Sequence, residues 1–265
     1  MLSVGMLSVG MSSASPDIAS LARRARALSV GAPTTYAFDS TYEKAGEQRG
    51  WANWLGEGLM LGQYPHCQPA EPGPNAEQAQ DHIRLALDAG IDCFVCLQAE
   101  LPPQDDEAAW PGDGVRLPEA ADRARWPAPF VRYAPVADAI NGAPLNYLHC
   151  PIIDLSVPGD GRGTGSSLLV LLDSIITHYE GGGTGVYMHC WGGRGRAGLV
   201  GACLLALMRP ELSAQAVLDS VQAGYDSRTG ASAMPGALKR SPQTDAQRQF
   251  VRSFVGEVRR QGRAS

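Results

Sequence analysis

The stretch that decides the fold is GVYMHCWGGRGRAG, which runs from Gly185 to Gly198. Its first part is a short apolar run that predicts a buried strand, and its end opens an apolar run to Met208 that predicts a helix. Three of the five residues between Cys190 and Arg196 are glycines. Glycine lets the chain curl so that successive N–H groups point inward and form a nest for a phosphate-sized anion. The stretch therefore predicts a strand, an anion-binding loop and a helix in direct succession.

The same loop contains the groups needed for covalent phosphate transfer. The N–H groups at a helix N-terminus, together with Arg196, favour Cys190 as a thiolate, which is a nucleophile. The planar guanidinium of Arg196 contacts two phosphate oxygens at once, a geometry that lysine lacks. We therefore predict Cys190 as the nucleophile and Arg196 as the residue that grips the phosphate. The residues predicted to bind substrate between them are Trp191, Gly192, Gly193, Arg194 and Gly195.

The decapeptide HCWGGRGRAG resembles the HCx5R signature loop of protein-tyrosine and dual-specificity phosphatases. Upstream, HCPIIDLSVPGDG at 149–161 is similar to the general-acid loop of that family, nearest to the branch related to kinase-associated phosphatase. This resemblance places Asp154 in the position of the general acid, with Asp160 as the alternative. It implies a reaction through a phosphocysteine that uses no metal and no cofactor.

Two weaker parts of the resemblance concern supporting residues. The segment QTDAQ at 243–247 is similar to the QTxxQ segment of tyrosine phosphatases, which implies that Gln243 and Gln247 help to place the hydrolytic water. The place of His189 in the motif implies that it orients the signature loop through hydrogen bonds rather than acting as an acid or base. Arg228, further along the chain, is predicted to lie in a solvated turn.

The sequence departs from the family pattern at two positions of the loop. Ala197 stands where the family usually carries serine or threonine, whose hydroxyl stabilises the leaving thiolate, so we expect hydrolysis of the phosphocysteine to limit turnover. The same departure leaves open a weakly active phosphate-binding adaptor. Arg194 adds a second cation, which either favours a highly phosphorylated ligand or points outward to a surface carboxylate.

Strand-length apolar runs alternate with helical patterns before the signature loop, and helical patterns alone follow it. This order predicts an α/β fold with a central, mostly parallel twisted sheet between helices, a three-layer sandwich that is helical at its C-terminal end. The predicted strands are 58–64, 91–97, 146–153 and 185–190, and the predicted helices are 76–89, a helix ending near 179, 196–208, 213–223 and 244–260.

One phosphatase domain is predicted over residues 51–260, with a surface insertion at about 99–144. Residues 1–50 begin with MLSVG written twice and continue rich in serine and arginine, so we expect a tail that is partly disordered or a targeting peptide. Residues 261–265 form a second short tail.

Composition narrows the class of protein. A net charge of −5 and a pI near 5.5 argue against a broad nucleic-acid surface, and no apolar run reaches the ~18 to 20 residues of a membrane span. The six cysteines lie mostly in apolar runs, and Cys93 and Cys96 are predicted to pack on opposite faces of a strand. We expect a cytoplasmic protein, with organellar targeting as the alternative.

The expected substrate is a phosphoprotein, foremost phosphotyrosine and also phosphoserine or phosphothreonine. The alternatives that keep the mechanism are a phosphoinositide, an inositol phosphate or a phosphoglucan. The sequence does not predict the oligomeric state.

Overall fold

A computed structural model describes residues 16–28, 30–44, 46–65, 76–116, 129–161 and 166–262. Its centre is a five-stranded sheet in the order β3-β4-β7-β5-β6. The strands are β3 (Ala52–Gly56), β4 (Leu59–Gly62), β5 (Cys93–Gln98), β6 (Asn146–Ile152) and β7 (Val186–His189). Only β3 and β4 pair antiparallel within this sheet, and the other neighbours pair parallel, which confirms the predicted mostly parallel sheet.

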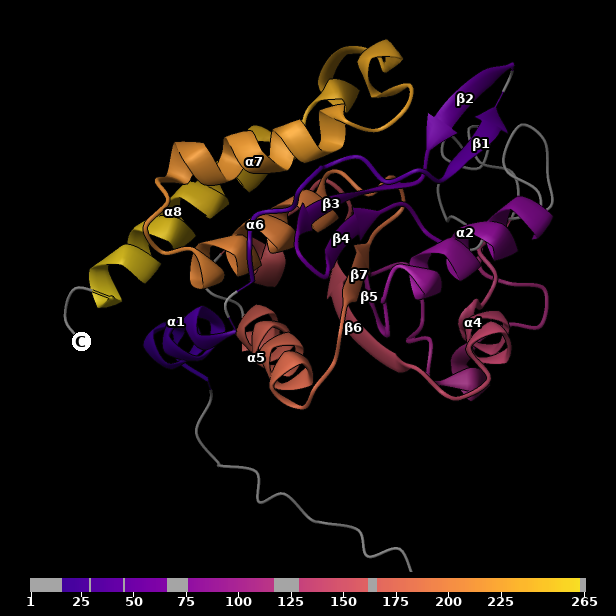
Figure 1. Cartoon of the computed structure of the whole chain (residues 1–265), viewed down its shortest axis with the longest axis horizontal. Coiled ribbons are helices and arrows are strands. Elements are labelled where there is room, and N and C mark those ends of the chain that lie inside the picture. The colour runs from indigo at the N-terminus through magenta and orange to yellow at the C-terminus, as the bar shows by residue number, and fades with distance from the viewer. Residues whose placement is uncertain are drawn as a thin grey trace, which may run out of the picture.

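Helices cover both faces of the sheet (Figure 1). One face carries α1 (Ile18–Ala27), α5 (Ser166–Glu180), α6 (Arg196–Met208), α7 (Ala214–Asp226) and α8 (Asp245–Gln261). The other face carries α2 (Ala76–Asp88) and α4 (Ala134–Asn141). Short 3-10 helices are η1 (Glu107–Ala109), η2 (Pro158–Gly161), η3 (Ala231–Ala233) and η4 (Gly236–Lys239). The predicted three-layer sandwich with a helical C-terminal end is confirmed.

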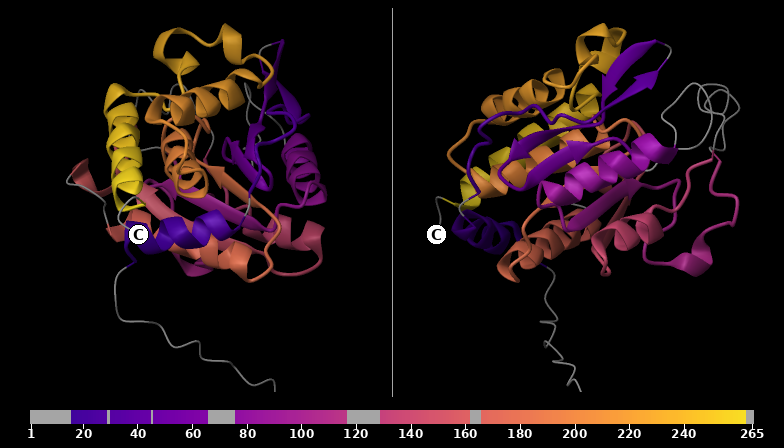
Figure 2. Two further views of the ribbon diagram at one scale, coloured as in Figure 1. Left: turned by 60° about the vertical axis from the view of Figure 1, so that its left-hand side comes forward. Right: turned by 45° about the vertical axis from the view of Figure 1, so that its right-hand side comes forward.

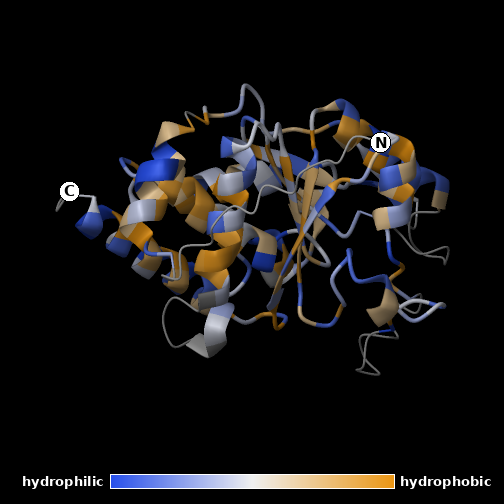
Figure 3. Cartoon of the chain, turned by 90° about the horizontal axis from the view of Figure 1, so that it is seen from below, coloured by the Kyte–Doolittle hydropathy of each residue, from blue (hydrophilic) through white to orange (hydrophobic). Residues whose placement is uncertain are grey.

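Two hydrophobic clusters, one on each face, hold the layers together. Every residue of β5 is buried, with Cys93 in the cluster under α6 and Cys96 in the cluster under α2, so the two thiols lie on opposite faces as predicted. Helix α6 is apolar all round and every one of its residues is buried, as expected for a helix between a sheet and further helices. Figure 3 shows hydrophobic stretches on the central strands and on the helices beside them.

The folded part of the chain begins before residue 51, in contrast to the predicted tail. Helix α1 starts at the N-cap Asp17 and buries Ile18, Leu21, Ala22 and Ala25 on one face against the helices of the first cluster. Figure 2 shows α1 beside the C-terminal helix α8. The helical spacing of these apolar residues among arginines explains why an arginine-rich segment is part of the core. The MLSVG repeat and residues 263–265 lie outside the described residues.

A β-hairpin also lies within the predicted tail. Strands β1 (Thr41–Lys44) and β2 (Glu47–Gly50) pair antiparallel, and the backbone N–H of Gly50 donates to Thr229 O at 2.9 Å. The hairpin is therefore attached to the segment that follows α7.

The described parts of the predicted surface insertion, residues 99–116 and 129–144, are partly core. Phe130, Tyr133, Ala134 and Ala137 are buried against α2 and the sheet in the second cluster. The prediction of a surface insertion is wrong for these residues, because aromatic and small side chains within a polar stretch supply a buried face. Within the described residues, no helix is both long enough and apolar enough to span a membrane.

Candidate active site

The signature loop connects the end of β7 to the start of α6. Cys190 directly follows β7 and is only 3% exposed, and Arg196 is the first residue of α6. Gly193 has φ of 66°, and a Cβ there would lie 2.2 Å from the carbonyl group of Gly62. No side chain fits this position, so the glycine lets the loop lie directly against the end of β4.

Buried groups hold the loop from behind. The guanidinium of Arg228 donates to Gly192 O at 3.3 Å and to Gly193 O at 2.8 Å, and it is anchored by Asn53 Oδ1 at 2.8 Å. The hydroxyl of Ser241 donates to the next carbonyl of the loop, that of Arg194, at 2.9 Å. Arg228 is buried, so the prediction of a solvated turn is wrong. With these carbonyls satisfied on the outside of the loop, its N–H groups are available to an anion on the inside.

Arg196 is fixed by a carboxylate that sequence reasoning missed. Its two terminal nitrogens, Nη1 and Nη2, donate to the two carboxylate oxygens of Glu100 at 2.7 and 2.9 Å, and Nη1 also donates to Ile152 O at 3.0 Å. Burial alone would lower the pKa of Arg196, but the charge of Cys190 and the hydrogen bond to Glu100 raise it above its usual value. The position of Glu100 in the sequence could have indicated it as a candidate site residue. It follows β5 directly, at the carboxyl edge that parallel strands share.

The remaining donor of Arg196 is suited to a ligand. Its Nε is buried, and within the described part of the chain it has no hydrogen-bond partner. A buried guanidinium N–H without an acceptor is costly, and a phosphate oxygen would satisfy it. Nη2 also lies 3.1 Å from Asp154 Oδ1. The structure thus brings together the predicted arginine and the predicted general acid, although they are distant in sequence.

His189, predicted to orient the loop, is held neutral by its buried environment. Its Nε2 lies 2.7 Å from the hydroxyl of Tyr133, and both side chains are fully buried. Burial, followed by the nearby charge of His149, lowers the pKa of His189 well below its usual value, whereas burial raises that of Tyr133. The tyrosine therefore keeps its proton and the histidine stays neutral, joined by one buried hydrogen bond. This arrangement supports the orienting role implied for His189.

The loop that carries Asp154 is exposed. Ile153 is 70% and Leu155 50% exposed, and Leu155 has φ of 60°, a conformation that is costly for a branched side chain. The side-chain oxygen of Thr244 donates to Leu155 O at 3.4 Å, and Nε2 of Gln247 donates to Ser156 O at 3.0 Å. These two contacts tie the acid loop to the start of α8. The side chain of the alternative acid, Asp160, lies outside what the structure describes.

Both the oxygen and the nitrogen of the Gln247 amide form hydrogen bonds within the protein. Its Oε1 accepts from the backbone N–H groups of Gln243 and Thr244, both at 3.1 Å, which forms a capping box at α8. One of the two hydrogens on Nε2 is donated to Ser156 O, so the amide of this buried side chain is anchored through both its oxygen and its nitrogen. The amide groups of Gln243 and Gln247 both lie near Gly195, and Oε1 of Gln243 also accepts from Nε of Arg194.

The two remaining side chains of the loop lie at its outer side. Nε of Arg194 donates to Gln243 Oε1 at 3.2 Å, and no described carboxylate pairs with it. The ring of Trp191 packs edge-on against Phe130, with centroids 6.3 Å apart, and its carbonyl accepts from Tyr64 N at 3.2 Å. Trp191 is thus held by the second hydrophobic cluster while part of it stays exposed.

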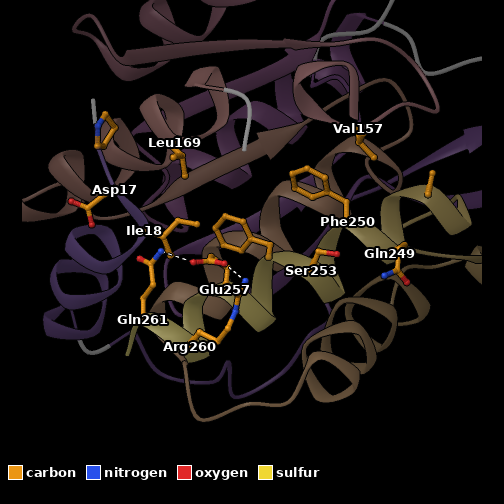
Figure 4. Close-up of a pocket in the computed structure, with 13 residues that line it drawn as sticks. Asp17, Ile18, Val157, Leu169, Gln249, Phe250, Ser253, Glu257, Arg260 and Gln261 are labelled. Atoms are coloured by element: carbon orange, nitrogen blue, oxygen red, sulfur yellow. Dashed lines mark hydrogen bonds and ion pairs between the residues drawn. The ribbon is translucent and has the colours of Figure 1, made fainter. Parts of the chain in front are cut away.

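An apolar groove of about 800 Å³ lies elsewhere, between α1, α5 and α8 (Figure 4). Ile18, Leu169, Phe250 and Phe254 line it, and none of its described lining residues belongs to the signature loop. The groove lacks both the predicted nucleophile and the predicted phosphate-binding arginine, so we place the candidate site at the signature loop.

Comparison with known proteins agrees with this placement. Residues 146–251 match the family described as Swiss Army Knife protein, DSP-PTPase phosphatase domain, a span that includes the Asp154 loop and the signature loop. The match confirms the resemblance predicted from the sequence. None of the curated proteins compared matches the chain.

Solved phosphatase structures are similar in fold at low identity. Kinase associated phosphatase with its catalytic cysteine replaced by serine is 17% identical, with a TM-score of 0.48 over 82% of this chain and 98% of that one. PTPMT1 is 16% identical, with a TM-score of 0.44 over 81% and 100%. Tk-PTP in the active form is 18% identical, with a TM-score of 0.43 over 77% and 96%.

Proposed function

From the premise that residues 146–251 belong to the DSP-PTPase phosphatase domain family, we propose that the protein hydrolyses phosphomonoesters through a phosphocysteine on Cys190. The observation that carries the proposal is that Arg196 forms ion pairs with both Glu100 and Asp154 beside the buried Cys190. Glu100 fixes the guanidinium, whose buried Nε has no partner among the described residues, and the exposed Asp154 lies 3.1 Å from Nη2 of the same group.

The reaction has two steps at this site. The Cys190 thiolate attacks phosphorus, the bond from phosphorus to the leaving oxygen breaks, and the carboxyl group of Asp154 gives its proton to that oxygen. In the second step the Asp154 carboxylate takes a proton from water, which attacks the phosphocysteine and releases inorganic phosphate and the thiolate. Arg196 and the loop N–H groups stabilise the phosphoryl oxygens in both steps.

The substrate that we propose first is a phosphoprotein, foremost with phosphotyrosine. A second candidate, a phosphorylated polyol or lipid headgroup, is favoured by one observation: Arg194 presents its cation at the loop without a described carboxylate partner. The cytoplasmic location expected from the sequence remains part of this proposal.

Stopped-flow turnover of p-nitrophenyl phosphate, without added metal, tests the mechanism. We expect Cys190→Ser to abolish activity, Asp154→Asn to lower it strongly, and Asp160→Asn to leave it near wild type. Equal losses from the two aspartate variants would remove Asp154 from its role. Folded wild-type protein that binds vanadate but shows neither turnover nor a burst would support the adaptor and overturn the enzyme proposal.

A panel of substrates then separates the candidates. Phosphotyrosine peptides, phosphoserine peptides and soluble inositol phosphates are compared by kcat/KM at equal ionic strength. A clear preference for the phosphotyrosine peptides would support the first candidate, and a preference for inositol phosphates would replace it with the second.

A further inference from the structure

Two large apolar side chains are exposed to solvent on either side of Asp154. Ile153 is 70% exposed and Leu155 is 50% exposed, and we call these two residues the apolar pair. Other exposed large hydrophobic side chains of the described chain, Leu85 of α2 and Val170 of α5, lie singly on helices. Single exposed side chains are normal on a protein surface. Two of them around a proposed catalytic acid indicate a surface that binds something apolar.

The backbone holds Leu155 in a conformation that leucine rarely adopts. Its φ is 60°, and among the described residues it is the one non-glycine residue with positive φ. Glycine and asparagine adopt this conformation at lower cost. An exposed side chain contributes little to the hydrophobic core, so folding stability does not explain a leucine here. Strain of this kind is typical of binding and catalytic sites.

The apolar pair lies beside the proposed site of reaction. Asp154 Oδ1 is 3.1 Å from Nη2 of Arg196, the residue proposed to bind the phosphate. Neighbouring Cα atoms are about 3.8 Å apart, so each residue of the apolar pair is one step along the chain from the acid. The residues that adjoin a phosphotyrosine in a peptide are separated from it by the same spacing. When the phosphate binds at Arg196, a neighbouring side chain of the peptide therefore comes within reach of the apolar pair.

The charge of the loop favours a peptide over a membrane surface as the ligand. Membrane-binding faces combine apolar side chains with lysine and arginine. Residues 153–158 include neither lysine nor arginine, and they include the acidic Asp154. Two side chains on one loop also match the size of one or two side chains of a ligand.

We propose that Ile153 and Leu155 are specificity-determining residues, which bind the aliphatic side chains next to phosphotyrosine in a protein substrate. The inference rests on the proposed phosphatase function and deepens its first substrate class. Contact between the apolar pair and an aliphatic side chain removes nonpolar surface of both partners from water, which favours binding. Polar flanking side chains gain nothing from this contact.

The test compares two phosphotyrosine peptides that differ only in the residues flanking the phosphotyrosine. One peptide has leucine on both sides, and the other has serine on both sides. For wild-type protein we expect kcat/KM to be about tenfold higher for the leucine peptide, mainly through a lower KM, because partial burial of leucine gives a gain of this size. The ratio between the two peptides is the readout, so a general effect of a variant on the reaction cancels.

Two variants of the apolar pair and one control test its role. Ile153→Ser and Leu155→Gly should each lower the ratio to about threefold, and the double variant should lower it to about one. Val170→Ser is the matched control, because it removes an apolar side chain that is 51% exposed on α5, and it should keep the tenfold ratio. An unchanged ratio in the double variant, or an equal loss in Val170→Ser, would overturn the proposal.

Leu155→Gly also separates binding from structure. Glycine accepts a φ of 60°, so we expect this variant to unfold at the same urea concentration as wild type or a higher one, although it loses selectivity. A lower unfolding midpoint together with an unchanged ratio would show that Leu155 has only a structural role.

Vesicles of phosphatidylcholine and phosphatidylserine test the membrane as the alternative ligand. We expect wild-type protein and the double variant to sediment with them equally. Sedimentation that depends on the apolar pair, together with equal kcat/KM for the two peptides, would overturn the peptide as the ligand.

The failure of this inference differs from the failure of the proposed function. Cys190-dependent turnover of p-nitrophenyl phosphate with equal kcat/KM for the two peptides would overturn the apolar pair as a specificity determinant and leave the phosphatase intact. Turnover of p-nitrophenyl phosphate with no turnover of either peptide would overturn this inference together with the phosphoprotein substrate. Absence of turnover of every phosphomonoester would instead overturn the proposed function.

Discussion

The signature loop is fixed from behind by buried side chains, whereas the loop that carries Asp154 is largely exposed and is tied to the start of α8 by Thr244 and Gln247. Arg228 and Ser241 satisfy three consecutive carbonyls of the signature loop, and Gly193 lies directly against Gly62. Around Asp154, by contrast, the neighbouring side chains are largely exposed. The difference matches the two tasks, because a phosphate site gains from preorganised donors and an acid must follow a variable leaving group.

The largest expected effect comes from removing the support behind the signature loop. Arg228→Met leaves two loop carbonyls and Asn53 without their charged donor, and each such hydrogen bond is worth about 1.5 to 3 kcal/mol. We expect kcat/KM for p-nitrophenyl phosphate to fall about 100- to 1,000-fold. The matched control is Arg252→Met, an exposed position of α8. A folded Arg228→Met protein with activity within about twofold of wild type would contradict the supporting role.

Acid should destabilise the core around two buried histidines, His82 and His189. Burial holds the pKa of His82 at about 3 and that of His189 well below its usual value, so the folded protein keeps both neutral. Below about pH 6.5 the unfolded chain binds protons that the folded chain does not, so stability is full above that pH and is lost as pH falls. At about pH 5.5 we expect a loss of about 1.4 kcal/mol for each histidine, measured by urea unfolding against pH 7.5. A free energy of unfolding that does not change would contradict the buried neutral histidines.

The next expected effect concerns Ala197, which lacks the hydroxyl of the serine or threonine usual at this position in the family. Ala197 is fully buried at the start of α6, next to Arg196. We expect wild type to show a burst of p-nitrophenol, and Ala197→Ser to remove the burst and raise kcat about tenfold, because the serine stabilises the leaving thiolate. A wild-type reaction without a burst, or a slower serine variant with normal stability, would contradict the expectation that hydrolysis of the phosphocysteine limits turnover.

The smallest expected effect comes from removing a contact that holds the loop carrying Asp154, the hydrogen bond from Gln247 to Ser156 O. Gln247→Glu keeps the acceptors of the capping box but loses the donor to Ser156 O. We expect about a fivefold loss for alkyl phosphates, whose leaving oxygen needs a proton, and little loss for p-nitrophenyl phosphate. Gln249→Glu places the same charge on an exposed position of α8 as the control. Equal losses on both substrates would show that Gln247 does not act through Asp154.

The parts of the site that could be predicted are those formed by residues that lie close together in the sequence. β7, the glycine-rich loop and α6 follow from an apolar run, a cluster of glycines and a second apolar run. Asp154 was reached through resemblance of a local segment. In each case the residues that define the feature are neighbours in the chain, so pattern and motif are sufficient.

The supports could not be predicted because they are long-range contacts. Glu100 and Arg196 are hydrogen-bonded although they are 96 residues apart in the sequence, and Arg228 and Gly193 are 35 residues apart. Nothing near either side chain in sequence indicates its partner, and a buried arginine is rare enough that a solvated turn was the expected place. Helix α1 differs in this respect, because its arginines indicate a tail, whereas its apolar residues have a helical spacing that only the structure shows to be buried.

Helix α1 and the end of α8 lie together. Pro16, Ile18, Arg260 and Gln261 line the same groove, and Arg26 of α1 lies near Gly262. A short linker would therefore join residue 262 to residue 16 without crossing the signature loop. The protein is thus a candidate for circular permutation, in which new ends are opened at a surface turn and the spliced ends keep α1 beside α8.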